Sequence, residues 1–184
     1  MNVVCFGDSN TFGYDPRSYI SERYSAESRW VDILAAKTGW RIRNNGMNGR
    51  EIPSQKTVFP KSTDLLIIML GTNDLLQGNS VHTVTERMER FLLSLSMDRK
   101  NILLLAPAPM QYGEWVQSDS LIAASIQLAE SFRLLAERMG VFFADAGRWC
   151  IPIAFDGVHF TEEGHRVFAH QLQKALQQIH IAST

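Results

Sequence analysis

The chain has 184 residues, and a polypeptide of this length buries roughly 70% of its extended surface on folding, enough for one hydrophobic core. Its formal net charge is −1, with acidic and basic residues scattered along the sequence, so neither a nucleic acid nor an anionic membrane surface is an expected partner. No apolar run reaches the eighteen or so residues that a membrane span requires. The composition therefore predicts one soluble domain over residues 1–184.

The first apolar run and the two cysteines bear on the cellular compartment. Residues 2–6 lead directly into a glycine turn, without the charged leader, apolar segment and cleavage site of a secretory signal. We therefore expect a cytoplasmic protein. Cys5 lies within this run, which favours a buried thiol over a disulfide with Cys150, and neither cysteine identifies a compartment.

Short apolar runs alternate with longer segments of helical period, the pattern of a parallel sheet with helices on both faces. Five runs are predicted to be strands: residues 2–6, 41–45, 64–70, 101–106 and 141–144. Residues 65–70 are apolar at every position, so the third strand should be buried on both faces at the centre of the sheet. The second strand is less apolar, which favours an edge.

Apolar residues recur three or four positions apart between these strands, which predicts four helices. They cover residues 27–38, 80–96, 120–139 and 161–179. Gly39 and Gly140 are helix stops, and Thr161 is the expected N-cap of the last helix. The sequence thus predicts an α/β fold with three layers, α/β/α, around a five-stranded parallel sheet.

Four short polar segments follow predicted strands. They are residues 7–10 (Gly-Asp-Ser-Asn), 45–50 (Asn-Gly-Met-Asn-Gly-Arg), 71–74 (Gly-Thr-Asn-Asp) and 156–159 (Asp-Gly-Val-His). In an open α/β sheet, ligands bind in the crevice beyond the carboxyl ends of the strands. We therefore expect the four segments to converge on one rim of the sheet.

Ser9, His159 and Asp156 are the residue types of a serine acyl-transfer site. A serine hydroxyl becomes an effective nucleophile when a base takes its proton. His159 is the candidate base, because Asp156 three residues earlier can hold Nδ1 while Nε2 faces Ser9. Taken singly, Ser9 with Asp8 is also typical of a turn cap, and Asp156-Gly157 of an ordinary turn.

Ser9, Gly49 and Asn73 supply the donors that such a reaction requires. Attack on an ester carbonyl places negative charge on its oxygen, and fixed N–H groups must already point at it. The candidates are the backbone N–H groups of Ser9 and Gly49 and the side-chain amide of Asn73. Glycine permits close approach and positive φ, and asparagine donates without bringing a charge. Singly, these residues are common in turns, and Asp8 and Asp74 are interpreted as loop-fixing groups.

The ordered set of segments resembles the SGNH, or GDSL-type, hydrolase superfamily, whose name lists Ser, Gly, Asn and His. The resemblance covers residues 3–170, and it implies the roles of nucleophile, oxyanion donor, base and orienting carboxylate for the residues just described. It also implies a flavodoxin-like sandwich, and ester hydrolysis through an acyl-serine intermediate without a metal or organic cofactor.

Residues 29–30 (Arg-Trp) and 45–50 look most similar to the arylesterase and acyltransferase branch of that superfamily. Two features depart from the pattern: residues 51–63 are shorter than the helical crossover of that branch, and Asn10 stands where leucine is commoner. A compact chain with no evident lid favours small esters with short acyl groups, such as acetyl esters. A preference for an alcohol over water as acceptor stays open.

Apolar side chains on the predicted rim loops are candidates for an acyl pocket, although exposed or packing positions are equally typical of them. They are Met110, Tyr112, Phe155 and, as the favoured one, Trp115. The remaining histidines lack the spacing of metal ligands and are interpreted as helix residues, so no metal is expected. They are His82, His165, His170 and His180.

Two other functions stay open. A thioesterase or lysophospholipase of the same superfamily would use the same site, because the site recognises the carbonyl group more than the leaving group. Residues 7–13 also resemble a phosphate-binding loop in outline, which would suit a flavin- or nucleotide-binding module, but neither glycine-rich phosphate motif has its spacing there. The expected partner is a small ester, and assembly into a homo-oligomer stays open.

Overall fold

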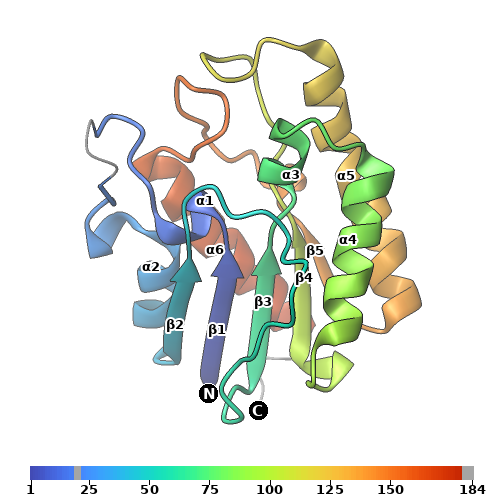
Figure 1. Ribbon diagram of the computed structural model, residues 1–184. Coiled ribbons are helices and arrows are strands. Elements are labelled where there is room, and N and C mark those ends of the chain that lie inside the picture. The colour runs from blue at the N-terminus through green and yellow to red at the C-terminus, as the bar shows by residue number, and fades with distance from the viewer. Residues whose placement is uncertain (19–21, 180–184) are drawn as a thin grey trace.

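The computed structural model describes residues 1–18 and 22–179, and it shows a five-stranded parallel sheet between two layers of helices (Figure 1). The strands are β1 (Asn2–Gly7), β2 (Arg41–Gly46), β3 (Leu65–Met69), β4 (Ile102–Ala106) and β5 (Phe142–Asp145). Their order in the sheet is β2-β1-β3-β4-β5, and every neighbouring pair is parallel. The predicted three-layer α/β fold is confirmed.

Six helices are described, and the four longer ones cover the sheet, two on each face. The six are α1 (Ser9–Phe12), α2 (Trp30–Thr38), α3 (Thr72–Leu76), α4 (Val81–Ser94), α5 (Asp119–Met139) and α6 (Glu162–Gln178). Three short 3₁₀ turns complete the set: η1 (Ala26–Ser28), η2 (Arg99–Asn101) and η3 (Ala146–Arg148). In Figure 1, α4 and α5 lie on one side of the sheet and α2 and α6 on the other.

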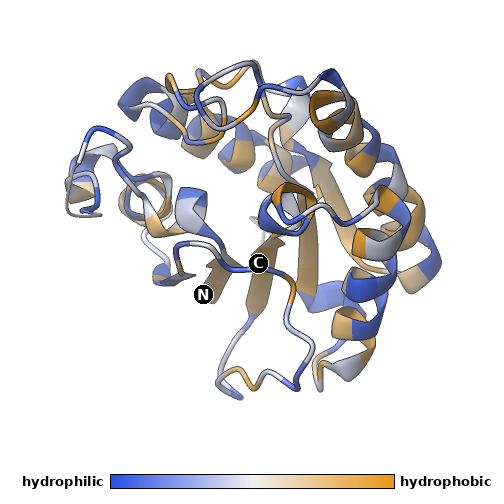
Figure 2. Cartoon of the chain, turned by 45° about the horizontal axis from the view of Figure 1, so that its top comes forward, coloured by the Kyte–Doolittle hydropathy of each residue, from blue (hydrophilic) through white to orange (hydrophobic). Residues whose placement is uncertain are grey.

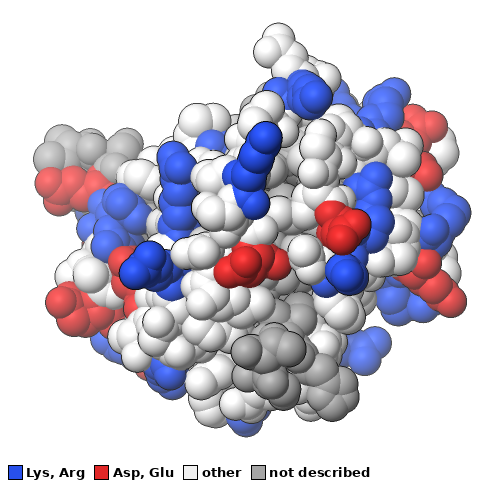
Figure 3. Space-filling view, turned by 90° about the horizontal axis from the view of Figure 1, so that it is seen from below, with Lys and Arg blue, Asp and Glu red and all other residues white. Residues whose placement is uncertain are grey.

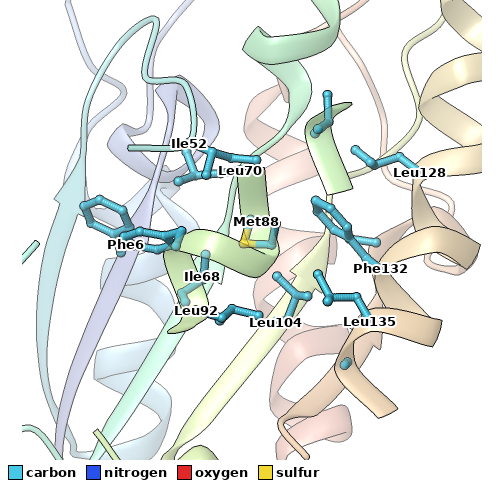
Figure 4. Close-up of a cluster of buried hydrophobic side chains, with 14 of the residues drawn as sticks. Phe6, Ile52, Ile68, Leu70, Met88, Leu92, Leu104, Leu128, Phe132 and Leu135 are labelled. Carbon is cyan, nitrogen blue, oxygen red and sulfur yellow. The ribbon is translucent and has the colours of Figure 1, made fainter. Parts of the chain in front are cut away.

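The hydrophobic core is divided by the sheet, because successive residues of a strand point to opposite faces. In β1, Val4 and Phe6 pack under α4 and α5, whereas Val3 and Cys5 pack under α2 and α6. The first of these clusters is drawn in Figure 4, where Met88 lies between Phe6 on one side and Phe132 on the other. The strands in Figure 2 are mostly in the hydrophobic colours, and the helices around them are banded with hydrophilic positions.

The sheet places β3 at its centre and β2 at an edge, as the sequence predicts. Every residue of β3 is buried, whereas Arg41 and Arg43 of β2 are exposed. Seen from the amino ends of the strands, basic and acidic side chains are interspersed over the surface (Figure 3). None of the described helices combines the length and the apolar character that crossing a lipid bilayer requires. The cellular location stays a prediction.

Predicted and observed elements differ mainly at their ends, and two differences are larger. The predicted helix 27–38 is broken, because the backbone of Arg29 is extended (φ −91°, ψ 131°) between η1 and α2. The short helix α3 was not predicted, since five residues are too few to show a helical period. Gly39 and Gly140 do end their helices with positive φ, and the Thr161 side chain caps α6 by accepting from the N–H of Gly164.

Residues 51–63 form no helix and run across the face of the sheet that α4 and α5 cover (Figure 1). Phe59 of this segment packs edge-on against Phe6, with ring centroids 5.2 Å apart. An aromatic contact of this kind buries apolar surface of both rings. The short segment therefore completes the layer without regular structure.

Candidate active site

Ser9 lies where β1 meets α1, at the carboxyl end of the strand. Asp8 is the N-cap of α1, and its side chain accepts a hydrogen bond of 3.0 Å from the N–H of Asn10. Gly7 has no space for a side chain, because a Cβ there would lie 2.0 Å from Oγ1 of Thr11 and 2.8 Å from the carbonyl oxygen of Met69. This tight turn holds the Ser9 hydroxyl at the rim of the sheet.

Ser9, His159 and Asp156 form one continuous chain of hydrogen bonds. Nε2 of His159 lies 2.9 Å from Oγ of Ser9, and Nδ1 lies 2.7 Å from Oδ2 of Asp156. All three residues are buried, with 5%, 3% and 1% of their surface exposed. The structure therefore brings together the three side chains that the sequence analysis selected from opposite ends of the chain.

The turn from Asp156 to His159 is fixed by the same carboxylate. Oδ1 of Asp156 accepts hydrogen bonds of 2.9 Å from the N–H groups of Val158 and His159. Gly157 has a φ of +84°, and a Cβ there would lie 2.2 Å from the carbonyl oxygen of Gln111, so the turn requires glycine. The Asp-Gly-Val-His segment thus holds both the carboxylate and the imidazole.

Burial alone would raise the pKa of Asp156, but hydrogen bonds from the His159 ring and from the N–H groups of His159 and Val158 outweigh it and hold the pKa below its ordinary value. Asp156 is therefore ionised at neutral pH. An ionised Oδ2 only accepts, so Nδ1 of a neutral His159 carries the proton and Nε2 has a free lone pair toward Ser9.

Asp8 behaves in the opposite way. Burial raises its pKa to about 6, although hydrogen bonds from nearby N–H groups act to lower it. Its side chain caps α1, in agreement with the interpretation of Asp8 as a loop-fixing group.

The three candidate oxyanion donors follow three neighbouring strands. Gly7 pairs with Gly46 of β2 and with Met69 of β3, so the turns after β1, β2 and β3 leave the sheet at one level (Figure 1). The backbone N–H groups of Ser9 and Gly49 have no acceptor among the described residues. The Asn73 amide donates to the carbonyl oxygen of Arg50 at 3.1 Å, which leaves its second N–H for a ligand.

Arg50 connects two of these turns, a role that the sequence analysis missed. Its guanidinium donates to the carbonyl oxygens of Gly7, at 3.0 Å, and of Asn45, and it lies 4.3 Å from the ring centre of Phe6. The signal in the sequence is the position of this arginine beside Gly49.

Asp74 fixes the same region from α3, as the sequence analysis proposed. Its carboxylate is fully buried, accepts from the N–H of Ile52 at 3.0 Å and binds Arg87 at 3.0 Å. The segment that carries Gly49 is therefore held on both sides.

Trp115 and Phe155, two of the four candidate pocket residues, lie at the site. The Trp115 ring is perpendicular to the His159 imidazole with centroids 5.0 Å apart, and Tyr14 lies 4.6 Å from the same imidazole. Trp115 and Phe155 are each 54% exposed, and they line a cleft of about 530 Å³ that runs along Asp156. Trp115 is thus placed where a substrate beside the imidazole would contact it, and Phe155 shares the cleft with Trp115.

Met110 and Tyr112, the other two, are not placed there. Met110 is only 2% exposed and belongs to the core under α4 and α5, and Tyr112 donates its hydroxyl to Asp119. Both border a separate cleft of about 780 Å³ whose lining contains no residue of the Ser-His-Asp chain. The sequence could not distinguish Trp115 and Phe155 from Met110 and Tyr112. All four lie on rim loops, and the side chains of a loop do not alternate in direction with a regular period as those of a helix or strand do.

The other described histidines are helix residues, as predicted, and His180 lies outside the described part of the chain. His82 pairs with Glu86 on α4, and His165 is buried on α6. Burial lowers the pKa of His165 to about 3, so it is neutral. Within residues 1–18 and 22–179, no group of three or more His, Cys, Asp or Glu side chains is arranged to hold a metal ion.

The sequence model of the GDSL-like lipase/acylhydrolase family matches residues 5–167, and the chain belongs to this family. Its SGNH-type hydrolase fold is shared with solved structures. The chain is 27% identical to a candidate arylesterase from Agrobacterium tumefaciens, covering 97% of this chain and 99% of that one with a TM-score of 0.83.

Two further structures share the fold. An aryl esterase from M. smegmatis is 24% identical, with a TM-score of 0.83, and a carbohydrate acetylesterase from Sinorhizobium meliloti is 24% identical, with a TM-score of 0.81. Each comparison covers 97% of this chain and 99% of the other. No curated protein matches the chain.

Proposed function

We propose that this protein hydrolyses small carboxylic esters through an acyl-serine intermediate, with Ser9 as the nucleophile. The observation that carries the proposal is the hydrogen-bonded chain from Ser9 through His159 to Asp156, with distances of 2.9 and 2.7 Å. Membership of a lipase/acylhydrolase family supports the same reaction class.

In the first half of the reaction, Oγ of Ser9 attacks the ester carbonyl carbon while Nε2 of His159 takes the hydroxyl proton. The carbonyl oxygen becomes an oxyanion, which accepts from the backbone N–H groups of Ser9 and Gly49 and from the Asn73 amide. The tetrahedral intermediate then collapses. The bond to the alcohol oxygen breaks, His159 returns the proton to that oxygen, and the acyl group stays on Ser9.

In the second half, a water molecule attacks the acyl carbon and gives a proton to His159. Collapse of this second intermediate breaks the bond to Oγ, releases the carboxylic acid and returns the proton to Ser9. An alcohol that replaces water at this step would give a new ester, so acyl transfer needs no further catalytic group.

Asp156 stabilises the imidazolium that forms in both halves. Its carboxylate lies 2.7 Å from Nδ1 in a buried setting, where a charge-assisted hydrogen bond is stronger than in water. The Trp115 and Tyr14 rings lie 5.0 and 4.6 Å from the imidazole, measured between ring centroids, and His159 is only 3% exposed, so these rings help to shield it from water.

A small ester with a short acyl group fits the surroundings of the site. The cleft beside Trp115 and Phe155 is open and of limited volume, about 530 Å³. Acetyl esters of alcohols or sugars are the proposed substrates, and the carbohydrate acetylesterase with the same fold supports this choice.

The nucleophile is tested most directly by covalent labelling. A fluorophosphonate probe should add one phosphonyl group to Ser9, identified by peptide mass spectrometry, and Ser9→Ala should remove both labelling and turnover while the circular dichroism spectrum is unchanged. Removing a triad nucleophile typically costs about 10⁶-fold in kcat. Ser94→Ala is the control and should retain full activity, because Ser94 is the last residue of α4, at the end of the sheet opposite to the rim that carries Ser9 (Figure 1).

Nitrophenyl esters of increasing acyl length test the substrate class. We expect kcat/KM to be highest for acetate and to fall as the chain lengthens. A maximum at long acyl chains, or a preference for thioesters over matched esters, would replace the proposed substrate class while leaving the serine mechanism in place.

A further inference from the structure

Asn10, the residue after the proposed nucleophile, is bonded to the main chain on both sides of His159. Its side-chain Nδ2 donates to the carbonyl oxygen of Val158 at 3.1 Å, and its Oδ1 accepts from the N–H of Phe160 at 2.9 Å. Only 5% of Asn10 is exposed, so both bonds are shielded from water. One amide therefore brackets the residue that carries the imidazole.

Asn10 is itself firmly placed. Its N–H donates to the Asp8 carboxylate at 3.0 Å, and its carbonyl oxygen accepts from Nε1 of Trp30 at 2.9 Å. Trp30 is 1% exposed and packs in the core under α2 and α6. The amide of Asn10 is thus a fixed point to which the loop around His159 is attached.

We propose that Asn10 is a positioning residue that sets the distance and direction between the His159 imidazole and the Ser9 hydroxyl; this inference rests on the function proposed above. Asp156 orients the imidazole ring about its own axis through Nδ1. The two bonds from Asn10 instead hold the main chain of residues 158–160 against residues 9–10. Together with the bond between Ser9 and His159, they close a small ring of hydrogen bonds.

The chemistry of the side chain explains why asparagine suits this place. The two main-chain groups are one acceptor and one donor, and a planar amide offers one of each at fixed separation. Leucine, the commoner residue at this position of the motif, offers neither. Asparagine supplies two directed bonds at this position, and its amide is too deeply buried to bind a substrate.

Replacing Asn10 by leucine should separate positioning from substrate binding. We expect Asn10→Leu to lower kcat and kcat/KM by about 10²-fold, the typical cost of a displacement of about 1 Å between reacting groups, while KM is unchanged. Fluorophosphonate labelling of Ser9 should slow by a similar factor, since labelling also requires His159 to take the hydroxyl proton.

Asn44 provides a matched control. Its side chain also makes one donor and one acceptor bond to main-chain groups, to the carbonyl oxygen of Thr11 at 2.8 Å and from the N–H of Gly46 at 2.9 Å. Asn44→Leu therefore removes the same kinds of bonds without touching residues 158–160. It should lower the melting temperature to a similar extent, with a change in labelling rate of less than about threefold.

A second control uses the base itself. If Asn10 acts through His159, the residual hydrolysis by His159→Ala should be unaffected by adding Asn10→Leu, so the two effects are strongly non-additive. If Asn10→Leu instead caused a general loss of structure, it would lower the activity of the wild-type protein and of His159→Ala by the same factor.

Asn10→Asp keeps the size and shape of the side chain. It tests the same proposal if the Asn10→Leu variant does not fold. An ionised carboxylate still accepts from Phe160 but cannot donate to Val158, whereas a protonated carboxyl does both. The deficit of this variant relative to the wild-type protein at the same pH should therefore shrink as the pH is lowered.

The outcomes are distinguishable. Wild-type activity that depends on Ser9, together with unchanged kcat and labelling in Asn10→Leu, overturns the role of Asn10 and leaves the proposed function intact. A wild-type protein without any Ser9-dependent hydrolysis overturns both. Equal losses in Asn10→Leu and Asn44→Leu would show that the residue serves stability alone.

Discussion

The two sides of the candidate site are built differently. On one side, Ser9, His159 and Asp156 are buried and already joined by hydrogen bonds. On the other side, Gly49 is exposed, and its N–H, like that of Ser9, has no acceptor within the described ranges. In the proposed mechanism, the residues that exchange a proton can be hydrogen-bonded before the substrate binds, whereas the groups that stabilise a developing charge must stay unpaired until that charge forms.

Each side is nevertheless fixed by residues that take no part in the reaction. Asn10 attaches the His159 loop to α1, while Arg50 and Asp74 hold the turn that carries Gly49. Catalytic groups must be held to within about 0.5 Å. In the proposed mechanism, these contacts supply that constraint from residues that do not react. The following changes probe the two sides separately.

Asp156→Asn should have the largest effect in this comparison, because it alters the paired side. An asparagine amide facing Nδ1 favours the tautomer with the proton on Nε2, so His159 can no longer accept from Ser9. We expect kcat to fall by up to about 10⁴-fold, measured with nitrophenyl acetate at pH 7. Asp145→Asn, which removes the charge of another turn-capping aspartate, should leave kcat unchanged. Equal activity of the two variants would contradict the assigned role of Asp156.

Asn73→Ala alters the unpaired side and should have a smaller effect. Loss of one oxyanion donor costs about 10²–10³-fold in kcat, with KM little changed, because the bond forms only in the transition state. Affinity for a boronic acid that forms a tetrahedral adduct on Ser9 should fall in parallel. Asn79→Ala serves as the control. It removes a hydrogen bond in the same region, from the side-chain amide of Asn79 to the carbonyl oxygen of Asp74. An Asn73→Ala protein that binds the boronic acid normally would remove Asn73 from the oxyanion hole.

Asp8→Asn alters a carboxylate that lies next to Ser9 but is not part of the Ser-His-Asp chain. We expect this substitution to change the stability of the protein. Burial raises the pKa of Asp8 to about 6, so the folded protein binds a proton more tightly than the unfolded chain. The free energy of unfolding therefore declines as the pH rises from about 4 to about 6, by about 2–3 kcal/mol in total. An asparagine cannot titrate and still caps α1.

Urea unfolding at a series of pH values measures this effect. The stability of Asp8→Asn relative to the wild-type protein should increase between pH 4 and pH 6 and then level off. A difference that is constant with pH would show that Asp8 titrates at its ordinary value in the folded protein.

The parts of this molecule that could be predicted are those that depend on local pattern. The uniform apolarity of residues 65–70 identified the central strand, and the Asp-x-x-His spacing identified the pair at Asp156 and His159. These features are visible in a few neighbouring residues. Their convergence followed from the rule that parallel strands present their carboxyl ends at one edge.

The contacts that position the site could not be predicted in this way. The bonds from Asn10 reach groups 148 and 150 residues away, and main-chain acceptors leave no trace in the sequence. Arg50 likewise binds carbonyl oxygens, which every residue offers. Met110 and Trp115 are both large apolar residues of one loop, yet one is buried and the other exposed, because only the tertiary fold decides which way each points.

The separation of 150 residues between Ser9 and His159 has a consequence for biosynthesis. A ribosome makes the base 150 residues after the nucleophile, so the hydrogen-bonded chain from Ser9 to Asp156 can form only after all five strands of the sheet have been made. Contacts of such long range close late in folding. Hydrolysis, once observed, would therefore report on completion of the native state more stringently than any spectroscopic signal of helix content.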